Sequence, residues 1–120
     1  MTYDVIALVP EIPDPRDIVA GMVAAGEQLR VAETANGAVI QLCDDTGRPL
    51  VSLETPVHVR VPDEISRLLG PELGARVTGP VWWLEARAPS DQPAAVALAH
   101  RYAHEIARRL NGHVWPPEAP

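Results

Sequence analysis

Apolar residues recur along this chain with two different periods, which separate candidate strands from candidate helices. Tyr3 to Val9 is a short apolar run rich in β-branched residues, typical of a strand covered on both faces. Between residues 50 and 61 apolar and polar residues alternate, which predicts a half-buried strand. One side would carry Val51, Leu53, Thr55, Val57, Val59 and Val61, and the other Ser52, Glu54, Pro56, His58 and Arg60. Pro56 cannot donate a ladder hydrogen bond, so it indicates an edge strand or a break.

Turn residues predict how the strands connect. Asn36-Gly37, between the apolar segments 29–35 and 38–43, predicts a two-residue hairpin because both residues tolerate positive φ. Residues 44–47, Asp-Asp-Thr-Gly, predict a second turn. The last predicted strand covers residues 81–86.

Capping residues and a helical period predict three helices. Asp14 is the expected N-cap of the first, with Pro15 at its first position and Gly26 as its end. Its apolar face would carry Ile18, Val19, Met22 and Val23. A short helix follows Pro62 and closes at Gly70-Pro71. The longest runs from residues 91–93 to about Leu110, with an apolar stripe at Ala95, Leu98, Ala99, Tyr102, Ile106 and Leu110.

This order of elements predicts an α+β fold, a two-layer α/β sandwich. We expect a mostly antiparallel sheet of about five strands, with two main helices on one face and one short helix. No linker or repeat divides the chain, so residues 1–117 are expected to form one domain and residues 118–120 a disordered tail.

Composition narrows the classes of function. Sixteen acidic residues against ten arginines give a net charge of −6, which disfavours binding to nucleic acid. Cys43 is the single cysteine, so no internal disulfide can form. No signal peptide begins the chain, and no apolar run approaches the roughly 20 residues that span a bilayer. We therefore expect a cytoplasmic protein without membrane insertion and without a cofactor.

His100 and His104 are the first candidates for chemistry. Their spacing of four residues puts two imidazoles on one helical face, where they could share a metal. The zinc-protease pattern requires Glu directly after the first His, but Arg101 stands there. The alternative is a solvated polar face, because the predicted core stripe leaves both histidines pointing outward.

Cys43 and the acidic pair at Asp44 are further candidates. Cys43 could be a nucleophile if His58 or His113 served as its base, or it could be an inert buried thiol. The carboxylates of Asp44 and Asp45 could hold Mg²⁺ or Ca²⁺, although Asp side chains also stabilise tight turns.

Trp82-Trp83 is the most informative motif for binding. Adjacent strand residues point to opposite faces, so Trp82 would join the core and Trp83 the polar face. An exposed Trp among charges is a common interface anchor. The predicted interface comprises Trp83, Glu85, Arg87, Glu54, His58, Arg60 and Trp115, beside Ser52. Alternatively the chain's own tail, through Trp115 and Pro116, covers Trp83.

Residues 79–87 (GPVWWLEAR), 112–116 (GHVWP) and 41–52 (QLCDDTGRPLVS) resemble an uncharacterised actinobacterial family. Genes of that family are associated with type VII (ESX-like) secretion loci in streptomycetes. The resemblance implies a cytoplasmic accessory or partner-binding role and no active-site residues.

Three hypotheses for function follow from the residues and this resemblance. The leading one is a non-enzymatic domain that binds a protein partner, or itself as a homodimer, through its open sheet face. The first alternative is a small metal-dependent or cysteine hydrolase using His100/His104 or Cys43. The second is a small-ligand module with an apolar pocket.

Overall fold

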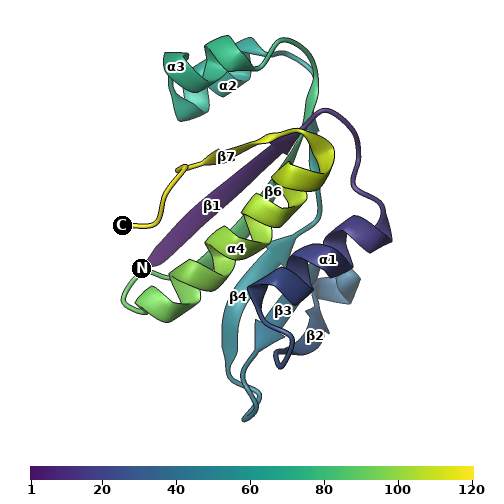
Figure 1. Cartoon of the computed structure of the whole chain (residues 1–120), viewed down its shortest axis with the longest axis vertical. Helices are drawn as coiled ribbons and strands as arrows, with labels where there is room; N and C mark the ends of the chain where they lie inside the picture. Colours follow the sequence, from purple (N-terminus) through teal and green to yellow (C-terminus); the bar gives the residue numbers. More distant parts are fainter.

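The chain folds as an open antiparallel sheet with two long helices on one face and a pair of short helices at one end (Figure 1). The computed structural model describes residues 1–120, except for the side chain of Ala35. The elements are β1 (Thr2–Val9), α1 (Pro15–Ala25), β2 (Arg30–Thr34), η1 (Ala35–Gly37), β3 (Val39–Cys43), β4 (Pro49–Glu54), β5 (Val57–Val59), α2 (Asp63–Leu69), α3 (Pro71–Arg76), β6 (Val81–Pro89), α4 (Pro93–Leu110) and β7 (His113–Trp115).

The sheet has seven strands in the order β2-β3-β4-β6-β1-β7, and β5 also pairs with β6. This confirms the antiparallel α+β architecture and corrects the expected number of about five strands. One extra strand arises because residues 50–61 split at Pro56 into β4 and β5. The other is β7, for which the sequence predicts no strand; it pairs with β1, for example through Trp115 and Ile6. A second short helix, α3, begins at Pro71, where only a helix end was expected.

Local signals explain how several elements begin and turn. Asp14 caps α1, accepting hydrogen bonds from the amides of Arg16 and Asp17 at 2.8 and 3.1 Å, as predicted. Asn36 and Gly37 both have positive φ, 57° and 86°, and connect the antiparallel pair β2 and β3, as predicted. The connection is longer than the expected two residues, because Thr34 pairs with Val39 and the turn η1 lies between them.

Helix α1 approaches α4 closely at Gly21, and it packs on the core with Ile18 and Met22 rather than with its valines. Gly21 is buried, and a Cβ there would lie 2.8 Å from the ring of Tyr102. This close approach turns Val19 and Val23 to solvent, where they are 52% and 49% exposed. The expected apolar face of α1 is therefore wrong at these two valines.

The two faces of the sheet bury different clusters. On the helix face, β1, β4 and β6 supply Val5, Val51 and Leu84 to the main core under α1 and α4. On the opposite face, a smaller cluster joins the sheet to α2 and α3; it contains Ile6, Leu8, Ile65, Val77 and Val81. Strand β1 is thus buried on both faces along residues 5–9, as its apolar run predicts.

Residues 57–59 lie on the faces opposite to those predicted. In β4, Leu53 pairs with Ala86, whereas in β5, His58 pairs with Trp82. The numbers of two paired residues add up to 139 between β4 and β6 but to 140 between β5 and β6. The register therefore shifts by one residue across Pro56. A one-residue shift reverses every side chain. His58 therefore lies on the helix face and Val57 on the opposite face.

Candidate functional site

The polar half of the sheet face opposite α1 and α4 is the first candidate site. It carries Ser52 and Glu54 of β4, Glu85 and Arg87 of β6, and Asp4 of β1. The pairings Asp4–Arg87 and Ser52–Arg87 place Asp4, Arg87 and Ser52 in one row across three strands. Glu54 and Glu85 lie two residues further along β4 and β6, on the same face. The structure therefore brings together five residues predicted for the open face: Ser52, Glu54, Trp83, Glu85 and Arg87.

Arg87 is the centre of an ion-pair network on this open face. Its guanidinium lies 2.9 Å from the carboxylate of Asp4, 2.6 Å from that of Glu85 and 3.7 Å from that of Glu54. The hydrogen bond to Asp4 and the attraction of all three carboxylates raise the pKa of Arg87 above its ordinary value. Three carboxylates around one cation leave the cluster with a net negative charge.

Trp83 borders the network and is only half-buried. Its indole Nε1 donates to the Glu85 carboxylate at 3.2 Å, and its ring packs beside the cluster of α2 and α3. Part of the cover of this ring therefore comes from that cluster, whereas the sequence suggests cover by the tail. Trp82 joins the main core on the other face, as predicted.

His58 and Arg60 do not belong to the open face, which corrects their expected place in the interface. The ring of His58 stacks on Trp82 with centroids 4.6 Å apart, on the helix face. Arg60 follows β5 and is exposed outside the sheet. The register shift at Pro56 separates both from Glu54 and Arg87.

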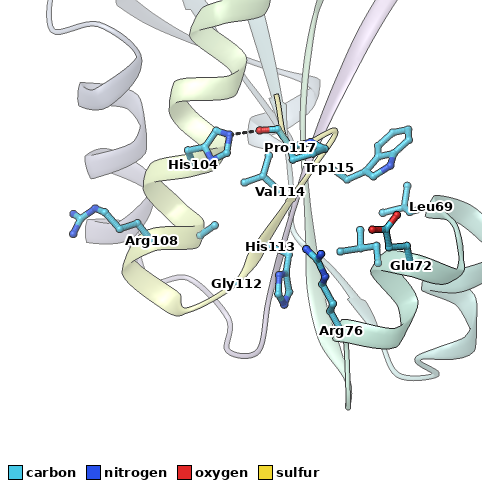
Figure 2. A pocket seen from close by; sticks show the side chains of 12 residues that line it. Leu69, Glu72, Arg76, His104, Arg108, Gly112, His113, Val114, Trp115 and Pro117 are labelled. Carbon is cyan, nitrogen blue, oxygen red and sulfur yellow. Dashed lines mark hydrogen bonds between the residues drawn. The ribbon is translucent and has the colours of Figure 1, made fainter. Parts of the chain in front are cut away.

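A groove at the free edge of β7 is the second candidate site (Figure 2). Its volume is about 560 Å³, within the size range of ligand pockets. Its lining comes from α2, α3, α4, β7 and the tail: Leu69, Glu72, Leu73, Arg76, His104, Ala107, Arg108, Gly112, His113, Val114, Trp115 and Pro117. Trp115, predicted for the interface, lies here and is 36% exposed. The sequence does not predict this groove, because it gives no sign that residues 113–115 form a strand.

His100 and His104 differ in environment although they share α4. The ring of His100 is 6% exposed, which corrects the expectation that it faces outward. Its Nε2 lies 3.1 Å from the Tyr3 hydroxyl oxygen, whereas its Nδ1 is buried and has no hydrogen-bond partner among the described residues. His104 is exposed, and its Nε2 donates to the Pro117 carbonyl at 2.9 Å. Among the described residues, no three His, Cys, Asp or Glu side chains form a group able to hold a metal.

The pKa of His100 is lowered from 6.5, first by burial and then by the neighbouring His104. In the unfolded chain this imidazole binds a proton near pH 6.5, whereas in the fold it binds one only at lower pH. We expect the free energy of unfolding to fall as the pH decreases through 6.5 and to level off below the folded pKa.

The variant His100→Gln should show a flatter pH dependence, measured by urea unfolding between pH 8 and pH 5.5. Parallel curves for wild type and variant would contradict the expected role of His100. Tyr3 from β1 and His104 from α4 are the groups facing the ring.

The fold keeps Cys43 apart from His58 and His113, the two bases considered for it. It pairs with Pro49 at the start of β4, whereas His58 lies beyond the end of that strand. His113 lies on β7, separated from β3 by β4, β6 and β1. The fold thus brings Cys43 near neither histidine, and its thiol is buried.

Asp44 organises the turn between β3 and β4. Its Oδ1 accepts from the amides of Thr46 and Arg48 at 2.9 and 3.0 Å and from the Thr46 hydroxyl at 2.6 Å. These hydrogen bonds lower the pKa of Asp44. The carboxylate serves the turn, as the alternative interpretation expects.

Comparison with known proteins finds no relative of this chain. No family model matches the chain, and searches of curated proteins and of solved structures find no match. Among the described helices, none has the length and apolarity required to cross a membrane.

Proposed function

We propose that this protein is a non-enzymatic interaction domain that binds a protein partner, or a second copy of itself, through its open sheet face. The observation that carries the proposal is the network of Asp4, Glu54, Glu85 and Arg87 beside a half-buried Trp83. The network orients the indole before any partner arrives, which reduces the entropic cost of binding. Trp and Arg are the residue types most often found at binding hot spots.

The net negative charge of the cluster favours a basic partner surface. A cation placed among Asp4, Glu54 and Glu85 would balance the carboxylates that Arg87 alone does not neutralise. The resemblance to a family associated with type VII secretion loci supports a cytoplasmic accessory role, with a secretion component as the partner.

The variant Trp83→Ala tests the proposal. Sedimentation velocity over a concentration series is expected to show self-association of the wild type, or affinity capture is expected to show one stoichiometric partner. The variant should weaken that interaction by at least about tenfold, because truncation of a hot-spot residue costs about 2 kcal/mol or more.

Two further variants separate binding from folding. Glu54→Lys reverses an exposed charge of the open face without touching the core and should also weaken the interaction. Val19→Ser, on the opposite layer, should leave it unchanged. A monomeric wild type whose captured proteins are the same for all three variants would overturn the proposal.

A further inference from the structure

The free edge of β7 offers unpaired backbone groups inside the groove described above. Strand β7 is the last in the sheet order and pairs only with β1 among the described strands. In an antiparallel pair, alternate residues direct their N–H and C=O groups away from the partner strand. Residues 113–115 therefore present backbone donors and acceptors to whatever lies along this edge, and such an edge can accept an added strand.

The walls of the groove favour an extended segment over a second copy of this chain. Helix α3 stands on one side of the β7 edge and the C-terminal half of α4 on the other (Figure 2). Two identical grooves would meet wall to wall, and their β7 edges could not reach each other. A single extended strand fits between the walls, and its side chains would alternate between the two.

Side chains in the groove supply apolar contacts and a cation. Leu73 and Trp115 provide apolar surface, and Arg76 extends from α3 toward His113 in Figure 2. The other arginine, Arg108, is paired with Glu105 at 2.6 Å, whereas Arg76 has no ion pair among the described side chains. Glu72 is the single carboxylate in the lining. On a chain of net charge −6, Arg76 thus provides a local site for an acidic side chain.

We propose that this groove binds an extended, acidic segment of another protein as an additional strand on β7. Backbone hydrogen bonds to residues 113–115 hold the segment, and one of its carboxylates pairs with Arg76. Its apolar side chains contact Leu73 and Trp115. The groove does not include Asp4, Glu54, Glu85 or Arg87, so this inference is independent of the function proposed for the open sheet face.

Selection from a displayed library of random octapeptides tests the inference. Peptides retained by the wild type are expected to be enriched in Asp and Glu and to alternate these with apolar residues. The highest-ranked peptide should bind at least about tenfold more weakly to Arg76→Glu, because a charge pair becomes a charge repulsion. Arg60→Glu makes the same charge change outside the groove and should bind like the wild type.

N-methylation of the selected peptide separates strand addition from side-chain binding. Every second N–H of an added strand faces its neighbour, so methylating one alternating series should abolish binding, while methylating the other should preserve it. Amide chemical shifts of residues 113–115 should change on titration with the unmodified peptide.

Three results would overturn the inference. They are absence of acidic enrichment, equal affinity for Arg76→Glu and Arg60→Glu, and equal effects of the two methylated series. The last would assign the groove to side-chain or small-molecule recognition instead.

Discussion

Replacing Leu84 with alanine is expected to lower the free energy of unfolding by about 2–5 kcal/mol, the usual cost of truncating a buried leucine. Leu84 is 2% exposed and belongs to the core cluster that joins β1, β4 and β6 to α4. Its removal would leave a cavity between the sheet and the helix layer, because rigid strands on both sides of β6 cannot close the space. Urea unfolding measured by circular dichroism gives the difference directly.

Leu68→Ala is the matched control for this truncation. It deletes the same atoms from a leucine that is 49% exposed on α2. We expect a change within about 0.5 kcal/mol. Equal losses for the two variants would contradict the assignment of Leu84 to the core.

Gly112→Ala is expected to destabilise the fold by about 3 kcal/mol and to disturb the pairing of β7 with β1. A Cβ at Gly112 would lie 2.2 Å from the carbonyl oxygen of Leu8 and 2.7 Å from Cγ1 of Val9. This oxygen belongs to the backbone of β1, which pairs with β6 along its whole length and is buried on both faces. We therefore expect β7 to move instead. Hydrogen exchange at residues 113–115 should become faster, while exchange in β6 stays slow.

Gly79→Ala provides the control for the added methyl group. A Cβ at Gly79 meets no described atom within 4 Å, so stability should change by no more than about 0.5 kcal/mol. Unchanged exchange in β7 of Gly112→Ala would contradict the close approach between residues 112 and 8. Gly112→Ala should also weaken peptide binding in the groove, because a displaced β7 moves the floor of the groove.

Features governed by neighbouring residues could be predicted from the sequence. The cap at Asp14, the hairpin at Asn36-Gly37 and the turn at Asp44 each depend on hydrogen bonds or φ angles within a few residues. The opposite faces of Trp82 and Trp83 follow from the period of a strand.

Predictions failed where a distant contact changed a local pattern. Pro56 was recognised as a break, but alternation alone does not reveal that one extra residue there moves His58 to the helix face. The apolar stripe of α4 places His100 on the polar face of that helix. In the structure, however, His100 is buried beside Tyr3, which lies 97 residues earlier in the chain. The helical period of α1 predicts that Val19 and Val23 face the core, because the period alone cannot show that Gly21 lets Tyr102 approach closely.

Of the two candidate sites, one could be predicted from the sequence and the other could not. Periodicity alone supplied the polar sheet face with Glu54, Trp83, Glu85 and Arg87, because alternation along a strand is a property of the local backbone. The groove at β7 could not be inferred, because three residues near the C-terminus become a strand only by pairing with β1, more than 100 residues earlier. Pairing energy between such distant segments depends on the whole fold, and no pattern within either segment encodes it.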